Sequence, residues 1–259
     1  MSKSKGKYPT ALVTGGRRGI GRSICVALAR RGYDVVLTDM VRDEEAEHTC
    51  ALIREAGREP LFVESNLGDL ASHSSVIDEA VCFNGTIDCL VNNAGVGSPS
   101  RGDLLDVSPK AFDSVHEVNL RGTFFMTQAV ARHMTSTPSG RARSIITVSS
   151  VSAGMASPER AEYCLSKSAL PMMTRLFALR LASANIAVFE VRPGIIRTPM
   201  TAGVAQQYEA RFEQGLVPAG RWGESDEVGQ AVATLADGSL AFSTGSVLNV
   251  DGGLSFPTF

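Results

Sequence analysis

The sequence has 259 residues, 44% of them apolar and 20% charged, which is enough for one large α/β domain with a buried core. The formal net charge of −2 gives no electrostatic reason to expect nucleic acid or an anionic membrane as a partner. Every apolar run is shorter than the ~20 residues that a membrane span needs. We therefore expect no nucleic acid and no membrane among the partners.

The N-terminal residues 1–9 are rich in lysine and lead directly into an apolar run, without the features of a signal peptide. The five cysteines show no C-x-x-C spacing, and the four histidines form no H-x-x-x-H pair. This pattern favours reduced thiols and predicts no metal site. We expect a flexible tail over 1–9, one domain over 10–259 and a cytoplasmic location.

Apolar runs and amphipathic segments alternate from the first strand to the last. The predicted strands cover 11–14, 34–39, 61–63, 87–91, 145–150, 186–191 and 246–250. The predicted helices begin near 20, 43, 69, 108, 158 and 224, and the fourth and fifth of them run to about 134 and 184. Ser108-Pro109 is typical of a helix start. Repeated strand–helix units at this spacing predict a doubly wound, seven-stranded parallel sheet with helices on both faces.

A glycine-rich turn, Thr14-Gly15-x-x-x-Gly19-x-Gly21, joins the first predicted strand to the first helix. Glycines let the backbone approach a pyrophosphate, and the helix N-terminus offers free N–H donors. Such a turn alone is often only a turn. Asp39 follows Gly19 by twenty residues at a strand end, where a carboxylate can accept hydrogen bonds from an adenosine ribose. The combination predicts dinucleotide binding.

Tyr163 and Lys167 lie four residues apart in a predicted helix, so their side chains share one face. A fixed positive charge near a phenol favours the phenolate, which makes tyrosine a better acid/base near neutrality. Ser150, at the end of a predicted strand, could meet this helix across a cleft. The three side chains could then polarise a substrate carbonyl and pass it a proton. The spacing alone is also typical of a solvated helix surface, so its weight depends on the surrounding sequence.

Six motifs together resemble the single-domain branch of the short-chain dehydrogenase/reductase family, in family order and over nearly the whole chain. They are Thr14-Gly15-x-x-x-Gly19-x-Gly21, Asn92-Asn93-Ala94-Gly95, Asn119, Ser150, Tyr163-x-x-x-Lys167 and Pro193-Gly194-x-x-x-Thr198. The resemblance implies a Rossmann fold and an NAD(P)-dependent oxidoreductase that interconverts a ketone and a secondary alcohol. It also implies a homotetramer built on long helices and a small-molecule carbonyl or alcohol substrate.

The resemblance implies a role for each matched residue. Tyr163 would be the acid/base, Lys167 would assist it and bind the nicotinamide ribose, Ser150 would donate to the substrate oxygen, and Asn119 would hold a water of a proton relay. Asn92 would line the adenosine ribose. The implied cofactor-binding residues are Gly15, Arg17, Arg18, Gly19, Ile20, Gly21, Asp39, Asn66, Leu67, Asn93, Ala94, Gly95, Tyr163, Lys167, Pro193, Gly194, Ile196 and Thr198.

The sequence contains opposing signals for the choice of cofactor. Asp39 would bind ribose hydroxyls and repel a 2′-phosphate, which favours NAD. Arg18 occupies a place where NADP-using relatives often have a basic residue that binds the phosphate, and Arg42 lies close by. We expect NAD(H) to be favoured, with NADP(H) left open. Asn66 stands where relatives usually have an aspartate against adenine, and its amide oxygen could still accept from the adenine amino group.

The substrate segment is expected at about 194–223. There Val204, Tyr208, Phe212 and Leu216 repeat every four residues and predict an apolar helical stripe, either a lid or a core or subunit contact. Polar groups at Ser157–Glu162 and Ser98–Arg101 suggest a small polar substrate or are simply solvated.

The segments 217–221 and 251–253 resemble 3-oxoacyl-acyl-carrier-protein reductases most, with sugar, polyol and steroid dehydrogenases nearly as similar. Two rival functions stay open. An extended-branch epimerase or dehydratase would need a different glycine spacing and a longer chain. A catalytically silent NAD-binding regulator would be expected to lack Ser150, Tyr163 or Lys167, and all three are present.

Overall fold

The computed structural model describes residues 6–201, 203 and 205–256. Within these residues, seven parallel strands form one sheet in the order β3-β2-β1-β4-β5-β6-β9. The strands are β1 (Thr10–Thr14), β2 (Asp34–Asp39), β3 (Pro60–Glu64), β4 (Cys89–Asn92), β5 (Arg143–Val148), β6 (Ile186–Pro193) and β9 (Val247–Val250). The strand order reverses between β1 and β4, so the predicted doubly wound parallel sheet is confirmed.

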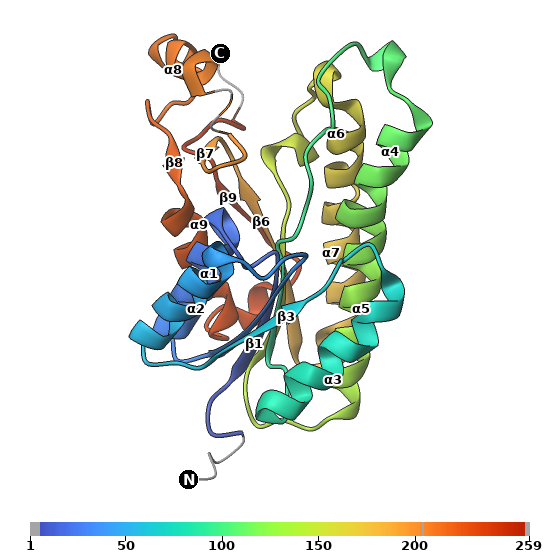
Figure 1. Cartoon of the computed structure of the whole chain (residues 1–259), viewed down its shortest axis with the longest axis vertical. Coiled ribbons are helices and arrows are strands. Elements are labelled where there is room, and N and C mark those ends of the chain that lie inside the picture. The colour runs from blue at the N-terminus through green and yellow to red at the C-terminus, as the bar shows by residue number, and fades with distance from the viewer. Residues whose placement is uncertain (1–5, 202, 204, 257–259) are drawn as a thin grey trace.

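Helices cover both faces of the sheet (Figure 1). One layer holds α1 (Gly19–Arg30), α2 (Glu44–Glu55) and α9 (Ser225–Ala236). The other holds α3 (His73–Asn84), α4 (Pro109–His116), α5 (Thr123–Ser136), α6 (Ala161–Ser168) and α7 (Leu170–Leu181). Successive strand side chains point to opposite faces, so Val35 and Leu37 pack beneath the first layer and Val36 beneath the second. The strands are apolar on both faces because both faces are buried.

Two predicted helices are interrupted. The helix expected from 108 to 134 contains a π-helical turn, Glu117–Gly122, between α4 and α5. In this turn the backbone at Gly122 passes so close to Leu67 that a Cβ there would lie 2.3 Å from the Leu67 carbonyl oxygen. The helix expected from 158 to 184 divides into α6 and α7, and Pro171 in the first turn of α7 cannot donate a backbone hydrogen bond.

The segment from 194 to 223 contains a short parallel pair, β7 (Ile196–Arg197) with β8 (Gly223–Glu224), and the helix α8 (Ala205–Glu213). Tyr208 and Phe212 share one face of α8 and pack against Trp222, with ring centroids 5.6 and 5.2 Å from it. The predicted stripe is wrong at Leu216, because α8 ends at Glu213 before Gly215 turns the chain with φ = 79°. Val204 lies outside the described residues.

The flexible tail expected over 1–9 falls partly outside the described residues, and from Gly6 onward the chain is anchored instead. The Asn84 amide accepts from the Gly6 N–H at 2.9 Å and donates to the Tyr8 carbonyl at 2.9 Å. The Arg58 guanidinium lies 3.5 Å from the Tyr8 ring centroid. In the described part of the chain, no helix is long and apolar enough to cross a membrane.

Candidate active site

The glycine turn follows β1 at the carboxyl edge of the sheet, beside the point where the strand order reverses. Gly15 and Gly19 have φ values of 67° and 55°, which L side chains rarely adopt. A Cβ on Gly21 would lie 1.9 Å from the Gly15 carbonyl oxygen, and one on Gly15 would lie 2.8 Å from the Ala94 Cα. The turn is therefore closed on itself and pressed against the Ala94 backbone.

The Asn-Asn-Ala-Gly motif at the end of β4 braces this turn. Asn93 Nδ2 donates to the carbonyls of Thr14 at 3.0 Å and Gly15 at 2.9 Å. In return, the Thr14 hydroxyl oxygen accepts from the backbone N–H groups of Asn93 and Ala94, each at 3.1 Å. The Asn93 side chain thus fixes the turn, so any contact with a nucleotide from this segment would come from Ala94 and Gly95.

Asn92, expected to line the adenosine ribose, points into the core instead. It is 2% exposed, and its Nδ2 donates to the hydroxyl of Thr127 at 2.8 Å and more weakly to that of Thr147 at 3.3 Å. Alternation along a strand explains this placement, because neighbouring residues at a strand end face opposite sides of the sheet. Asn92 therefore joins β4 to α5 and β5.

The N-terminus of α1 is well suited to a pyrophosphate. Arg18 occupies the N-cap with extended backbone, its side chain makes no capping hydrogen bond, and the first turn carries no acid. The first N–H groups of a helix lack intrahelical acceptors and carry a positive field. Together with the glycine turn, where added Cβ atoms would collide, these groups fit the diphosphate of a dinucleotide.

Asp39 ends β2 at the same edge, where an adenosine ribose would lie in this fold. Arg17 Nε lies 3.5 Å from Asp39 Oδ1, and Arg17 Nη1 donates to Asp43 Oδ2. Arg42 is turned to Glu47, with 2.7 Å between Nε and Oε1. Arg17, and not Arg18 or Arg42, is therefore the cation in contact with Asp39.

Asn66 and Leu67 form the wall expected near adenine. Asn66 Oδ1 accepts from the Gly68 N–H at 3.0 Å, which closes a local turn and occupies one side of the amide oxygen. Leu67 is buried, and its carbonyl lies 2.9 Å from Nε2 of His73. Leu67 is thus held as an apolar surface, whereas the Asn66 oxygen already has one donor.

Tyr163 and Lys167 project from one face of α6, as the spacing predicts. The Lys167 ammonium lies 5.7 Å from the Tyr163 ring centroid and donates to the Val148 carbonyl at 3.4 Å. Lys167 is 5% exposed. A Cβ on Gly95 would lie 3.4 Å from its Nζ. The lysine therefore lies between the end of β5 and the Gly95 backbone.

Asn119 lies in the π-helical turn and is locked by three hydrogen bonds. Its Oδ1 accepts from the Val96 N–H at 2.8 Å, and its Nδ2 donates to the Val96 carbonyl at 2.9 Å and the Ser166 hydroxyl at 3.1 Å. Single π turns occur often at functional sites. The extra residue in this turn directs the amide towards the backbone next to Gly95 and towards the helix that carries Tyr163.

Ser150 follows β5 and caps the 3₁₀ turn Val151–Ala153. Its Oγ accepts from the Ser152 N–H at 3.1 Å. Because a hydroxyl that accepts one hydrogen bond keeps its own proton to donate, Ser150 can still donate to a substrate oxygen. Capping and donation are therefore compatible in this side chain.

The segment after β6 reaches both halves of the site. A Cβ on Gly194 would lie 2.7 Å from the Asp251 Cα, so this glycine permits β6 and the residue after β9 to approach closely. Further along, a Cβ on Gly19 would lie 3.8 Å from side-chain atoms of Thr198 and Pro199. Ile196 is buried in β7, and Pro193 is the last residue of β6. The predicted nicotinamide segment therefore runs back to the glycine turn.

Arg160 lies beside Tyr163, although the motifs do not identify it. Its guanidinium lies 5.4 Å from the Tyr163 ring centroid, and its Nη2 is 3.5 Å from the Ser152 hydroxyl. It connects the 3₁₀ turn after Ser150 to the start of α6. The sequence indicated it only as one of the polar residues at 157–162, which suggest a polar substrate or are simply solvated.

A buried acid, Glu190, connects the ends of β5 and β6 next to these residues. Glu190 in β6 is fully buried, and its Oε1 accepts from the Ser149 hydroxyl at 2.5 Å and from Arg192 Nε at 3.0 Å and Nη2 at 2.9 Å. Ser149 precedes Ser150, and Arg192 precedes Pro193. The network therefore ties the two strand ends that carry the site. The sequence feature that could have identified this network is the pair of charged residues, Glu190 and Arg192, in a strand that is otherwise apolar.

Among the described residues, no cluster of histidine, cysteine or acidic side chains could hold a metal ion. Burial raises the pKa of the Cys89 thiol to about 12 and raises that of Cys25 strongly. These two core thiols are therefore protonated at neutral pH and do not act as nucleophiles.

Comparison with known proteins gives a consistent family. A family model described as enoyl-(acyl carrier protein) reductase matches residues 15–255. A structure of a 3-oxoacyl-[acyl-carrier protein] reductase from Brucella melitensis in complex with NAD is 50% identical, has a TM-score of 0.95 and covers 98% of this chain and 99% of that chain. The 3-oxoacyl-[acyl-carrier-protein] reductase FabG of Staphylococcus aureus is 34% identical over 248 residues, 95% of this chain and 97% of that protein.

A structure from Agrobacterium tumefaciens with bound NADP is 31% identical, with a TM-score of 0.85 over 95% of this chain and 96% of that chain. Relatives of the same fold thus hold either nicotinamide dinucleotide. With a family model and relatives that each match most of its length, the chain belongs to the short-chain dehydrogenase/reductase family of oxidoreductases.

Proposed function

We propose that the protein interconverts a ketone and a secondary alcohol with a nicotinamide dinucleotide, using Tyr163 as the acid/base. The observation that carries the proposal is the meeting of Tyr163, Lys167, Asn119 and Gly95. The Lys167 ammonium is 5.7 Å from the tyrosine ring, and an added Cβ on Gly95 would be within 3.4 Å of both Lys167 Nζ and Asn119 Oδ1. This meeting lies at the carboxyl edge of the sheet, next to the braced glycine turn.

The roles of the side chains follow from their chemistry. Tyr163 donates its phenol proton to the carbonyl oxygen during reduction and takes it back during oxidation. The Lys167 ammonium stabilises the negative charge that develops on the tyrosine oxygen, and the Ser150 hydroxyl donates to the substrate oxygen as charge accumulates there. Hydride exchange with the carbonyl carbon is the chemistry that the nicotinamide supplies when bound. The protein supplies position, charge and the proton.

In this proposal Asn119 has a structural role in addition to the role in a proton relay that the family resemblance implies. Its amide holds the Val96 backbone to Ser166 of α6, so it sets the distance between the Gly95 segment and Tyr163. The resemblance adds a water between Asn119 and Lys167, and Asn119 Oδ1 keeps a second lone pair with which it could accept from that water.

We propose NAD(H) as the preferred cofactor and NADP(H) as the second candidate. Asp39 at the end of β2 can accept hydrogen bonds from both ribose hydroxyls, whereas it repels a 2′-phosphate at the same place. The Brucella melitensis relative in complex with NAD supports the preference for NAD(H). The Agrobacterium tumefaciens relative with bound NADP supports NADP(H) as the second candidate.

For the substrate, we propose a 3-oxoacyl thioester, as the names of the most similar relatives suggest. A sugar, polyol or other small alcohol is the alternative. The segment 194–223 would form the lid, with its apolar face made by Tyr208, Phe212 and Trp222. A silent NAD-binding regulator is disfavoured because the side chains needed for proton transfer lie together.

The test is a screen of the wild-type protein with both nicotinamides, in which alcohols are oxidised and keto-acyl thioesters reduced while the nicotinamide absorbance is followed. The proposal predicts turnover of at least one class with NAD(H). Tight binding of NADH without turnover of any class would support the silent regulator instead. The cytoplasmic location stays a prediction that cell fractionation would test.

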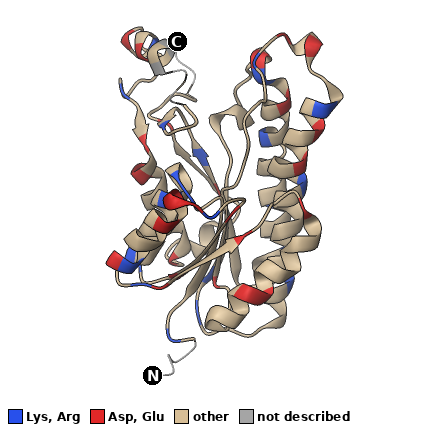
Figure 2. Cartoon of the chain, viewed as in Figure 1, with Lys and Arg blue, Asp and Glu red and all other residues tan. Residues whose placement is uncertain are grey.

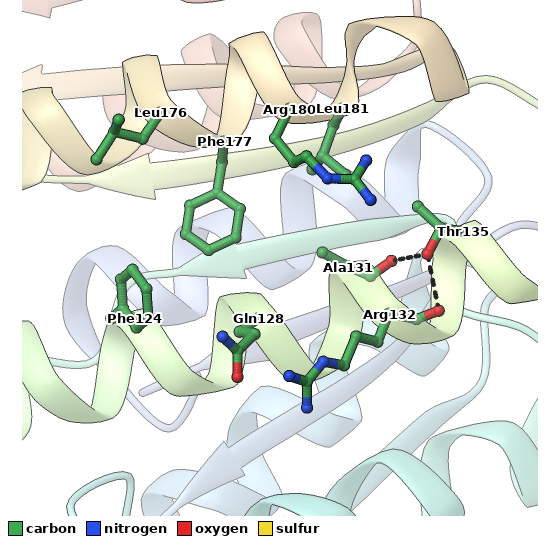
Figure 3. Close-up of a pocket in the computed structure, with 9 residues that line it drawn as sticks. All are labelled: Phe124, Gln128, Ala131, Arg132, Thr135, Leu176, Phe177, Arg180 and Leu181. Atoms are coloured by element: carbon green, nitrogen blue, oxygen red, sulfur yellow. Dashed lines mark hydrogen bonds between the residues drawn. The ribbon is translucent and has the colours of Figure 1, made fainter.

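We also propose that the protein is a homotetramer assembled partly through α5 and α7. A groove of about 360 Å³ lies between these helices and is lined by Phe124, Gln128, Ala131, Arg132, Thr135, Leu176, Phe177, Arg180 and Leu181 (Figure 3). On α7, Leu176 and Leu179 are exposed, the latter at 81%. A second copy would cover this apolar face. Light scattering of the purified protein should give four times the chain mass, and a monomer would contradict the proposal.

A further inference from the structure

Arg17 lies between two carboxylates at the edge of the predicted ribose site. Its Nε is 3.5 Å from Asp39 Oδ1, and its Nη1 donates to Asp43 Oδ2. The Arg17 Nε is buried and makes no hydrogen bond within the part of the chain that the structure describes. The pairing to Asp39 is therefore electrostatic and incomplete, whereas Asp43 holds the guanidinium directly.

Asp43 has two separate functions. Its Oδ1 accepts from the Ala46 N–H at 3.1 Å, which caps α2, while its Oδ2 accepts from Arg17. Desolvation raises the pKa of Asp43, but the Ala46 amide and the Arg17 charge outweigh it, so the pKa lies below its usual value. Asp43 is therefore ionised at neutral pH and remains paired with the Arg17 guanidinium.

The backbone of Arg17 is fixed as well. Its carbonyl accepts from the Thr49 hydroxyl at 2.7 Å and from Arg22 Nη2 at 3.2 Å, and Thr49 is fully buried. The backbone carbonyl and the guanidinium of Arg17 are thus both tied to the layer of α1 and α2. The guanidinium could move towards a ligand only by leaving Asp43.

The charges around the ribose site favour a hydroxyl over a phosphate. Asp39, Asp43 and Arg17 together carry one net negative charge, and Arg42 is already paired with Glu47. Arg18, the exposed N-cap residue of α1, is the other guanidinium of the glycine turn. Figure 2 shows acidic and basic residues close together around α1 and α2, whereas the strands carry few charges. A 2′-phosphate brings further negative charge next to Asp39, while the nearest guanidinium is engaged by two acids.

We propose that Asp43 is a specificity-determining residue that favours NAD(H) over NADP(H) by keeping Arg17 away from a 2′-phosphate. This inference rests on the nicotinamide binding proposed above. In this arrangement Asp39 recognises the ribose directly, and Asp43 acts through Arg17. Removal of the Asp43 charge frees a guanidinium that is already 3.5 Å from Asp39 and suited to bidentate phosphate binding.

The variant Asp43→Asn separates the two functions of the residue, because asparagine caps a helix about as well as aspartate but carries no charge. Calorimetric titration of the protein without substrate, first with NADH and then with NADPH, gives the ratio of the two dissociation constants. We expect Asp43→Asn to bind NADPH about tenfold more tightly than wild type and to bind NADH within about twofold of wild type. Thermal unfolding monitors the α2 cap.

Two further variants identify the cause. Glu44→Gln removes an acid from the first turn of the same helix, next to Asp43, that pairs with no guanidinium among the described residues, so the ratio should stay near that of wild type. Arg17→Gln combined with Asp43→Asn should cancel the gain in NADPH binding, because the freed cation is gone. A gain in Glu44→Gln equal to that in Asp43→Asn would overturn the inference in favour of net charge alone.

An unchanged NADH to NADPH ratio in a folded Asp43→Asn protein would overturn the inference and leave the proposed function standing. A wild-type protein that binds NADPH more tightly than NADH would also overturn it. Failure of the folded wild type to bind either nucleotide would overturn both the inference and the proposed function.

Discussion

The proposed nucleotide half and the proposed substrate half of the site are held in different ways. On the nucleotide side, the backbone at Gly21 packs against the Gly15 carbonyl without room for a Cβ, and the Asn93 side chain donates to the carbonyls of Thr14 and Gly15. On the substrate side, the 194–223 segment depends on aromatic contacts among Tyr208, Phe212 and Trp222. The first half has no room for a Cβ at Gly15 or Gly21, whereas the second depends on contacts between large side chains that a substitution can remove.

This difference predicts that substitutions in the two halves impair different properties of the protein. Changes at the glycine turn should reduce folding and nucleotide binding together, because the same backbone does both. Changes in the 194–223 segment should affect the use of substrate while the nucleotide still binds. The predictions below use this separation, from the largest expected effect to the smallest.

The largest effect is expected from Gly21→Ala. The added Cβ would lie 1.9 Å from the Gly15 carbonyl oxygen, so the turn must open. We expect a loss of about 1–3 kcal/mol in the free energy of unfolding and loss of measurable NADH binding. Urea unfolding and NADH titration check both. Gly97→Ala is the control, because a Cβ there meets nothing within 4 Å. A Gly21→Ala protein that binds NADH like wild type would contradict the rigid nucleotide half.

An intermediate effect is expected from Tyr208→Ala. This change removes the Tyr208 contacts with Phe212 and Trp222 from the aromatic cluster on α8, while the glycine turn is untouched. We expect KM for the substrate to rise about tenfold, with the NADH dissociation constant within about twofold of wild type. Steady-state kinetics and NADH titration measure the two effects. Unfolding would instead indicate a core role for α8, and dissociation of subunits in light scattering would indicate an interface role.

The smallest effect is expected from Glu227→Gln at the far end of the segment. Glu227 in the first turn of α9 binds Arg221 through two hydrogen bonds of 2.9 and 2.7 Å. First the Arg221 hydrogen bond and then the Glu224 N–H lower the pKa of Glu227 from 4.5 to about 2. Both side chains are substantially exposed, so solvent screens the pair.

Because the folded-state pKa is lowered, the stability from Glu227 is complete above pH 4.5 and is lost as the pH falls through about 2. Glu227→Gln should therefore lower Tm by about 1–3 °C at neutral pH, and the difference from wild type should vanish near pH 2. Calorimetry across this range measures it. A difference that persists below pH 2, or that grows with added salt, would show that the ion pair is not its source.

Local patterns in the sequence predicted most of the fold. The bounds of β2 match the predicted 34–39, and Asp43 and Ser108 cap their helices through their own side chains. Each of these features depends on a few neighbouring residues: alternation of apolar runs, a capping oxygen or a proline in the first turn. The glycines of the turn were found for the same reason, because a tight turn leaves a local signal.

The features that the sequence could not predict depend on contacts between distant segments. The π turn directs Asn119 to Val96, twenty-three residues away, and Gly6 is anchored by Asn84 across seventy-eight residues. Arg17 was assigned to the cofactor, but its pairing with Asp43 requires that two loops meet. Asn92 was expected at the ribose and instead faces α5, because the end of β4 keeps its alternation.

The most direct test of the account is Tyr163→Phe, measured in one preparation for both turnover and NADH binding. Removal of the phenol hydroxyl leaves the ring and Lys167 in place, so we predict a fall in kcat of about 10³ with an NADH dissociation constant within about twofold of wild type. Tyr8→Phe, which removes the hydroxyl of a ring that lies against Arg58 before β1, should change neither. Unchanged turnover in Tyr163→Phe would contradict the assignment of Tyr163 as the acid/base.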